Sequence, residues 1–420
     1  MSSKEEYEEL VEGDKRLKRI NDAIKLKKPD RVPILLMNHF FPAKYFGITN
    51  EDAFYDLDKW LNANDRFIEE FKPDLYFPPN APVFAPGKVN EILGMQQVKW
   101  PGHGVAYNKS FQFVEDEYML QEEYDLFIED PSDFVFRKYL PRVFNNLDGF
   151  EMLPPLKTFM LGYVGASIIS AFANPKVIES FEKFLEAAKK SAEWNIAYNE
   201  FHKKQLEKGY HAFNGATALA PFDVISDMLR GMRGSMLDMF RCPEKIIAAE
   251  DKILPCMIEV TIQNAKMSNN PRVFIPLHRG ADGFMSNEQF EKFYWPYLKK
   301  LIMALIDADL IPCPLFEGKY DQRLEYLKEL PKGKVLGIFD KSDIFKVKEE
   351  LGDTMCIAGD MPASFLKVGP EEKIEEYTKK LINKVGKDGG FIMSSNTVLD
   401  DVEPELLKKW VEYTKKYGKY

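Results

Sequence analysis

The chain has 420 residues, of which 45% are hydrophobic, 29% charged and 13% aromatic. This composition excludes disordered, collagen-like and disulfide-stabilised proteins, and the net charge of −9 argues against a dedicated nucleic-acid binder. The N-terminus, MSSKEEYEEL, is too charged for a signal peptide, and the four cysteines (Cys242, Cys256, Cys313 and Cys356) are scattered without a CxxC pair. We therefore expect reduced thiols and a cytoplasmic location.

The first 30 residues are rich in charge and predict a helical extension ahead of the first apolar run. Nine short apolar runs bounded by Gly, Pro or Asp then predict parallel strands that are covered on both faces. They are RVPILLM (31–37), DLYFPP (74–79), TFMLGYV (158–164), GATALAPF (215–222), RVFIPLH (272–278), LIPCPLFEG (310–318), KVLGIFD (334–340), TMCIAGD (354–360) and GGFIMSS (389–395).

One of these runs lies within an uncharged stretch of 18 residues, from Thr158 to Pro175. A membrane helix needs about 20 predominantly apolar residues, and this stretch contains Gly, Ser and Asn and ends in Pro. We therefore expect a buried strand over 158–164 that runs into a helix, and no membrane segment.

Amphipathic stretches separate most of the later runs and predict helices at 176–209, 243–269, 286–307, 370–386 and 403–418. Alternating strands and helices predict a parallel sheet, and this number of units favours a single (β/α)8 TIM barrel over 31–420. A doubly wound sheet is the alternative, but no Gly-rich phosphate turn follows any strand. Residues 80–155 interrupt the alternation and predict an insertion over the mouth of the barrel.

Polar side chains at the carboxyl ends of barrel strands face the ligand-binding mouth. His278 and Glu317 end neighbouring predicted strands, and an imidazole and a carboxylate are competent zinc ligands. In the alternative interpretation, His278 is a neutral barrel residue and Glu317 pairs with Arg279 or Arg323. The carboxylates of Asp223 and Asp227, at a helix start, are expected to cap that helix. Further candidates for substrate contacts are Asn38, His39, Asn80, Asp340 and Asn396.

Several segments resemble the uroporphyrinogen decarboxylase superfamily, and specifically its corrinoid-dependent methyltransferase branch. They are RVPILLM, FKPDLYF, HRGADGFMSNEQFEKFYWPYLKKLI, CIAGDMPASFLKVGPEE and GGFIMSSN…VEPELLKK, which extend from Arg31 to the C-terminus. The resemblance implies a (β/α)8 barrel enzyme.

Departures from the family pattern favour one branch. The decarboxylases carry Met-Arg-Gln-Ala-Gly-Arg after the first strand and an Asp after the second, where this chain reads MNHFFPAK and PPNAPV. Methyltransferases that serve coenzyme M hold zinc through His-x-Cys and a later Cys, where this chain has Leu315-Phe316-Glu317 and a residue near Thr397. The missing thiols favour a harder zinc site of His278 and Glu317, suited to an ether oxygen.

The resemblance therefore implies a methyltransferase that moves a methyl group from an aryl methyl ether to a Co(I) corrinoid. No Asp-x-His-x-x-Gly motif is present, so the corrinoid is expected on a separate corrinoid protein. Three alternatives stay open: a methyl-corrinoid:thiol methyltransferase, a decarboxylase or lyase on the same barrel, and a non-catalytic binding protein. The sequence does not decide between a monomer and a homodimer.

Overall fold

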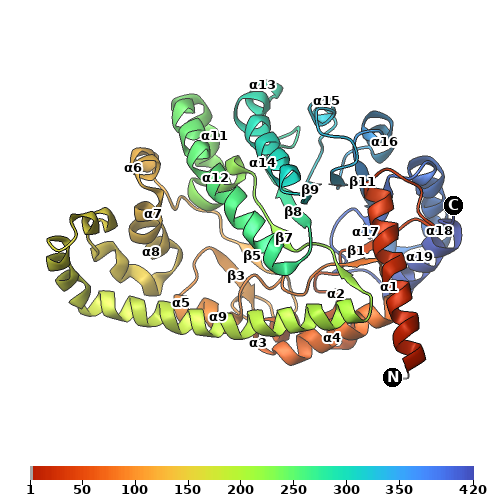
Figure 1. The fold of residues 1–420 in the computed structure, drawn as a ribbon, viewed down its shortest axis with the longest axis horizontal. Coiled ribbons are helices and arrows are strands. Elements are labelled where there is room, and N and C mark those ends of the chain that lie inside the picture. Colours follow the sequence, from red (N-terminus) through yellow and green to blue (C-terminus); the bar gives the residue numbers. More distant parts are fainter. Residues whose placement is uncertain (1–2) are drawn as a thin grey trace.

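Parallel strands at the centre of the molecule are surrounded by helices (Figure 1). The computed structural model describes residues 3–420, with side chains described from Glu12 onward. The central strands are β1 (Leu35–Leu36), β2 (Leu75–Tyr76), β6 (His211–Ala212), β7 (Ala216–Thr217), β8 (Arg272–Leu277), β9 (Ile311–Phe316), β10 (Leu336–Phe339), β11 (Cys356–Met361) and β12 (Phe391–Ser395).

These strands form two parallel sheets, of order β12-β11-β10-β9-β8-β7 and β1-β2-β6, which join at both ends. At one end, β6 and β7 are halves of a single extended segment: the Phe213 N–H donates to Tyr76 in β2, and the Gly215 N–H donates to Arg272 in β8. At the other end, a parallel bridge between Ile34 and Met393 joins β1 to β12. Within residues 3–420, eight parallel segments thus make the ring of a (β/α)8 barrel, and the predicted fold class is confirmed.

The predicted strand over 158–164 is wrong. Residues 158–161 end a 3-10 helix, η4 (Leu156–Leu161), and residues 162–164 form a turn, with Gly162 at positive φ, that leads into a second one, η5 (Gly165–Ala173). The side chains are not buried, since Met160 is 83% exposed and Tyr163 is 92% exposed. Lack of charge did not imply burial here, because this segment belongs to a lobe beside the barrel. The barrel strand that follows β2 is instead the 211–217 segment, which the predicted run at 215–222 covers only in part.

Helices pack around the outside of the ring between successive strands (Figure 1). All five predicted helical stretches are present, and two of them, 286–307 and 370–386, include a π-helical segment. No helix among the described residues is long and apolar enough to cross a membrane. The outer helices are α4 (Leu57–Phe71), α9 (Pro175–Glu207), α12 (Pro243–Ser268), α14 (Trp295–Asp307), α15 (Leu324–Leu327), α16 (Ile344–Leu351), α18 (Glu371–Leu381) and α19 (Pro404–Tyr417).

Shorter elements follow the carboxyl ends of the strands. After β1 come α2 (Phe41–Phe46) and α3 (Asn50–Tyr55). After the 211–217 segment come α10 (Pro221–Asp223), the wide helical turn η6 (Val224–Leu229) and α11 (Gly231–Arg241). Later in the chain, α13 (Asn287–Gln289) and η7 (Phe290–Tyr294) lead directly into α14, and α17 (Ala363–Val368) follows β11, whereas η8 (Ile382–Gly386) ends α18 ahead of β12.

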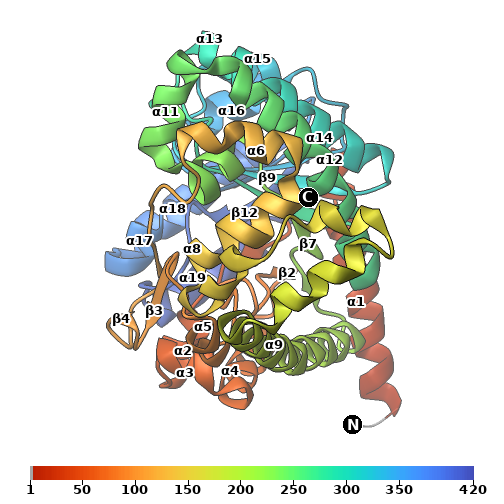
Figure 2. The same cartoon turned by 90° about the vertical axis from the view of Figure 1, so that its left-hand side faces the viewer.

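A long excursion between β2 and α9 contains a small sheet and a helical lobe. In the sheet, β3 pairs in parallel with β4 and antiparallel with β5. The lobe packs on the 33-residue helix α9, and Figure 2 shows both on the side of the molecule that faces the viewer. The elements are α5 (Gly87–Leu93), β3 (Val98–Pro101), β4 (Gly104–Val105), β5 (Gln112–Phe113), η1 (Gln121–Glu123), α6 (Tyr124–Glu129), α7 (Pro131–Phe134), η2 (Val135–Tyr139), α8 (Leu140–Val143) and η3 (Asn145–Met152).

The N-terminal helix α1 (Ser3–Ile24) covers the end of the barrel at which the strands begin. Its apolar residues Ile20, Ala23 and Ile24 belong to the same buried cluster as Leu35 and Cys356, which open β1 and β11. A separate and larger core fills the space between the strands and the outer helices. The barrel is therefore closed at its amino end, and the polar residues at the carboxyl ends of the strands face the other end.

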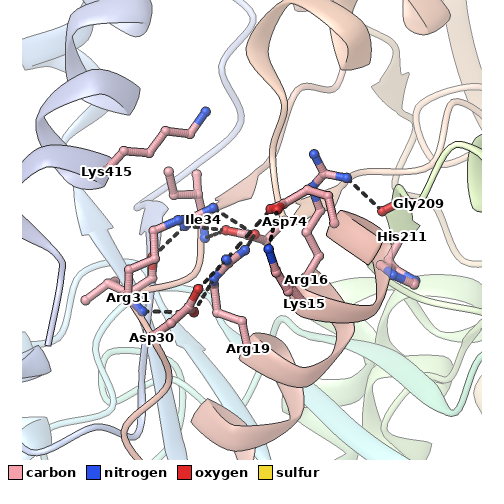
Figure 3. Close-up of polar contacts among 12 residues, drawn as sticks. Lys15, Arg16, Arg19, Asp30, Arg31, Ile34, Asp74, Gly209, His211 and Lys415 are labelled. Carbon is pink, nitrogen blue, oxygen red and sulfur yellow. Dashed lines mark hydrogen bonds and ion pairs between the residues drawn. The ribbon is translucent and has the colours of Figure 1, made fainter. Parts of the chain in front are cut away.

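A fully buried carboxylate, that of Asp74, fastens α1 to the first two strands (Figure 3). It accepts hydrogen bonds from Arg19 of α1 at 2.6 Å, from Arg31 at 2.7 and 3.0 Å, and from the Ile34 N–H at 2.8 Å. Arg19 also makes a two-pronged ion pair with Asp30, with both N···O distances at 2.7 Å. Fork-shaped pairs of this kind are both strong and directional.

We expect Asp74→Asn to lower the free energy of unfolding by about 3–5 kcal/mol, because two guanidinium groups lose their buried partner. Denaturant unfolding followed by circular dichroism measures this change. The matched control is Asp30→Asn, whose carboxylate is 57% exposed and should cost less than about 1 kcal/mol. Equal stability losses in the two variants would contradict the central role of Asp74.

Candidate functional site

The carboxyl ends of β8, β9 and β10 bring three polar side chains to one sector of the mouth. His278 follows β8, Glu317 follows β9 and Asp340 follows β10, and these strands are neighbours in the sheet. The His278 Nε2 atom lies 3.8 Å from the Glu317 Oε1 atom. The structure thus places His278 and Glu317 side by side, in the arrangement expected from the order of the strands.

His278 donates hydrogen bonds to two carboxylates. Its Nδ1 donates to Asp227 Oδ2 at 2.5 Å, and its backbone N–H donates to Asp223 Oδ2 at 3.0 Å. Both acids lie in the turn formed by α10 and η6, where a helix-capping role was expected. That interpretation missed their contacts with the histidine. Because Nδ1 is occupied, Nε2 is the ring nitrogen available to a ligand.

The charge on His278 follows from these neighbours. Burial alone would lower the pKa of His278, but the hydrogen bond to Asp227 and the charges of Asp223, Asp227 and Glu317 outweigh it and raise the pKa to about 9. His278 is therefore an imidazolium at neutral pH. Its Nε2–H is a charged hydrogen-bond donor that points toward the mouth.

Asp223 holds the backbone that carries this histidine. Its buried carboxylate also accepts the Arg279 N–H at 3.0 Å and the Tyr294 hydroxyl at 2.7 Å. Burial raises the pKa of Asp223 to about 6. Nothing in the sequence pattern singled out Tyr294, because it lies among the aromatic residues of a helix.

Arg279 completes the cluster and connects it to the excursion. Its guanidinium donates to Asp227 Oδ1 from Nε at 3.0 Å, pairs with that atom through Nη2 at 2.8 Å, and donates to Ser226 at 2.8 Å. Nη2 also lies 3.8 Å from Oε2 of Glu115, which comes from the excursion. Arg279 is thus paired with Asp227, and the nearest basic side chain to Glu317 is His278.

Glu317 and Asp340 make this sector acidic. Burial raises the pKa of Glu317, and the charge of Asp340 adds to the shift although His278 opposes it. Asp340 accepts a hydrogen bond from the Gly318 N–H at 3.2 Å, which ties the ends of β9 and β10 together. The sector therefore combines one cationic donor with two carboxyl groups, of which Glu317 has a raised pKa.

The other predicted contact residues are dispersed around the mouth. Asn38 is buried, and its side-chain oxygen accepts a hydrogen bond from the Phe77 N–H of the barrel at 2.9 Å. Asn396 accepts from the Ala363 N–H at 3.0 Å and so caps α17. Asn80 is exposed in a turn after β2. His39 is paired with Asp400 at 2.8 Å, away from the His278 cluster. Among these residues, His39 is the one with a ring nitrogen, Nε2, that is not bonded to Asp400.

The donor set for the expected zinc ion is incomplete. A protein zinc site uses three or four ligands, and this sector offers His278 Nε2 and Glu317. Among the described side chains, no three His, Cys, Asp or Glu residues gather closely enough to hold one ion. The residues present therefore do not fit a resident zinc ion in this arrangement, and no step below depends on one.

Comparisons with known proteins agree with the fold. A family model described as "Uroporphyrinogen decarboxylase (URO-D)" matches residues 174–417, more than half of the chain. Uroporphyrinogen decarboxylases from Chlorobaculum parvum and Geobacter metallireducens are 25% and 27% identical, over 42% and 46% of this chain and 50% and 57% of theirs. The chain thus spans about half the length of the curated relatives it matches.

One solved structure resembles the whole chain. It is described as a methyltransferase from Methanosarcina mazei and superposes with a TM-score of 0.59 at 13% identity, covering 95% of this chain and 98% of that one. Similarity at this identity establishes a common fold.

The charge state of His278 can be measured directly. In a pH titration of the protein with labelled histidines, followed by NMR, we expect the His278 resonance to titrate near pH 9. Because this pKa lies above the unfolded value of about 6.5, the associated stabilisation is complete below pH 6.5 and is lost as the pH rises toward 9. Asp227→Asn should move the midpoint back toward 6.5, whereas Asp340→Asn, which removes a carboxylate that does not contact His278, should not. A wild-type midpoint near 6.5 would contradict the assignment.

Metal content is a second measurable property. Because two ligands hold zinc weakly, we expect purified protein to contain less than about a tenth of an equivalent. Elemental analysis after dialysis measures it. One equivalent of zinc that disappears in His278→Gln would show that the ligand set includes residues which this arrangement does not bring together.

Proposed function

Because the chain belongs to the uroporphyrinogen decarboxylase family, we propose that it is an enzyme of this barrel type that transfers a methyl group. The donor in this proposal is a small aryl methyl ether, and the acceptor is the Co(I) corrinoid of a separate protein. The observation that carries the proposal is the His278 imidazolium, fixed by Asp227 and directed at the mouth beside Glu317.

Such a transfer requires a hydrogen-bond donor at the leaving oxygen, and the His278 imidazolium is such a donor. As the cobalt electron pair forms a bond to the methyl carbon, the bond between that carbon and the ether oxygen breaks, and negative charge develops on the oxygen. A charged N–H placed at that oxygen stabilises the transition state. His278 Nε2–H can then pass its proton to the aryl oxide, so that the phenol leaves neutral and the imidazole regains a proton from water.

Glu317 supports this step through its position. Its carboxyl lies beside Nε2, and burial favours its protonated form. A protonated Glu317 offers a second hydrogen bond to the leaving oxygen, and an ionised one holds the imidazolium. Asp223 and Asp227 keep the ring orientation constant during the proton transfer, since both the ring and the backbone of His278 are bonded to them.

The end of β1 supports an ether rather than a porphyrinogen as the substrate. Where the decarboxylase pattern has arginines, this chain has Asn38, His39, Phe40 and Phe41, and both phenylalanines are buried. Cationic side chains for several propionates are therefore missing from this part of the mouth. The absence of an Asp-x-His-x-x-Gly motif supports a corrinoid that arrives on a partner.

A decarboxylase is the second candidate, and one observation favours it. The curated relatives that match are decarboxylases, and a charged acid such as His278 could also protonate the carbanion that remains after carbon dioxide leaves. Release of carbon dioxide from an aromatic or pyrrolic acid, without any corrinoid, would support this candidate over methyl transfer.

The proposal is tested by incubating the protein with a panel of methoxylated aromatics and a reduced corrinoid protein, and recording the methyl–cobalt absorption. We expect at least one donor to methylate cobalt, with a rate that falls above about pH 9 as His278 loses its proton. His278→Gln should lower kcat by about 100-fold or more, because the charged donor is lost.

The matched control is His103→Gln. His103 is exposed, stacks on Trp100 at 4.6 Å and lies outside the site, so its replacement should leave the rate within twofold. Failure of every donor to methylate cobalt would refute methyl transfer. Equal losses in the two histidine variants would refute the role of His278.

A further inference from the structure

The lobe beside the barrel carries a large exposed apolar surface. The helices η4 and η5 and the turn between them lie at the left edge of the molecule in Figure 1, away from the barrel strands. They expose six large apolar side chains, each between 39% and 92% exposed. We call these six residues the lobe patch: Phe159, Met160, Leu161, Tyr163, Val164 and Ile169.

The lobe patch is one surface on a packed support. Five of its six residues fall within 159–164, so their side chains are neighbours along the chain. Beneath them, the ring of Phe172 in η5 packs against Phe159 in η4 and against Phe181 in α9, with ring centroids 5.9 Å apart in both pairs. These contacts join η4 and η5 to each other and to the long helix α9.

The polar side chains around the lobe patch already have hydrogen-bond partners. Residues 158–175 contain no Asp, Glu, Lys or Arg. The hydroxyl groups of Thr158, Ser167 and Ser170 each donate to the backbone carbonyl three residues earlier. The surface is therefore neutral, and these three hydroxyl groups donate within their own segment.

The charges at the two ends of this segment are neutralised within the chain. Lys157 pairs with Glu129 at 2.7 Å, and Lys176 pairs with Asp148 at 3.2 Å. Helices that lie on lipid surfaces combine an apolar face with a polar face rich in Lys and Arg. Because the two lysines beside the lobe patch are paired, its chemistry favours a protein surface over an anionic lipid surface.

The charge of the whole chain favours a second copy of the chain as the occupant. Two copies, each with a net charge of −9, repel each other over most of their surfaces. The lobe patch is a place where they can meet without opposing like charges. In a dimer with twofold symmetry the same patch faces itself, and a neutral apolar surface is complementary to its own copy.

The size of the lobe patch also fits a dimer. At their exposed fractions, the six side chains present roughly 700 Å², whereas the largest apolar patch on a typical monomer is about 300–600 Å². A stable interface of standard size buries about 800 Å² on each partner. The lobe patch supplies most of that area before any polar rim is added.

We propose that two copies of this chain form a twofold-symmetric dimer in solution through the lobe patch. Met160 and Tyr163, which expose the largest fractions of the six, form the centre of the interface. The helix α9 and the Phe172 contacts hold both patches in the shape that they have in the single chain. This inference does not depend on the proposed function.

Sedimentation velocity of the full-length protein, from about 0.1 to 100 μM, tests the proposal. We expect a shift from one copy to two with a Kd in the micromolar range, as suits an interface at the lower end of the standard size. Met160→Glu and Tyr163→Glu should each raise this Kd about 100-fold or more, because symmetry places two carboxylates in one apolar interface.

The matched control is Met267→Glu. Met267 is as exposed as Met160 but lies in the last turn of α12, on the barrel, so its replacement should leave the dimer Kd within twofold. Circular dichroism should be the same for all three variants, since each replaced side chain faces solvent in the single chain. Salt gives a test without any variant: raising NaCl from about 0.05 to 0.5 M should not weaken the dimer, because screening reduces the repulsion between two acidic copies.

Four outcomes would overturn the proposal. The first is wild-type protein that stays monomeric up to about 100 μM, and the second is a dimer that persists unchanged in both Met160→Glu and Tyr163→Glu. The third is a dimer that dissociates in high salt, since such an interface rests on ion pairs. The fourth is monomeric wild-type protein that floats with phosphatidylcholine vesicles, which would assign the lobe patch to lipid.

Discussion

The barrel depends on a buried charge cluster centred on Asp74. One carboxylate joins the guanidinium groups of Arg19 and Arg31 to the backbone at Ile34, so that α1, β1 and β2 meet at one point. Ile34 also makes the bridge to Met393 that closes the ring. Fixing the amino ends of the strands in this way determines the height at which their carboxyl ends emerge, and hence which side chains meet at the mouth.

Much of this architecture could be predicted from sequence, because a strand buried on both faces leaves a short apolar run between turn residues. Eight of the nine predicted runs contain a strand. The run at 158–164 failed because apolarity reports a preference for burial and cannot report whether a partner strand is available. The 211–217 segment was only half recognised, since it begins at His211, a buried polar residue of a kind that a core strand seldom contains.

The candidate site could also be predicted only in part. His278 and Glu317 could be found from the rule that strand ends converge, because they follow adjacent parallel strands. Their partners could not, since Asp227 meets His278 through the wide turn η6, whose geometry leaves no periodic signal. The contact of Glu115 with Arg279 depends on how the excursion folds back onto the barrel. Long-range contacts of this type are set by tertiary packing and are absent from local patterns.

The closure of one barrel end by α1 has a consequence for the order of events. Ile20, Ala23 and Ile24 fill the amino end, so the carboxyl end is the entrance to the polar residues at the mouth. A protein seated over that entrance blocks the passage of a smaller molecule. Under the proposed methyl transfer, the small donor would therefore enter first, the corrinoid protein would follow, and the demethylated product would depart only after that protein has left.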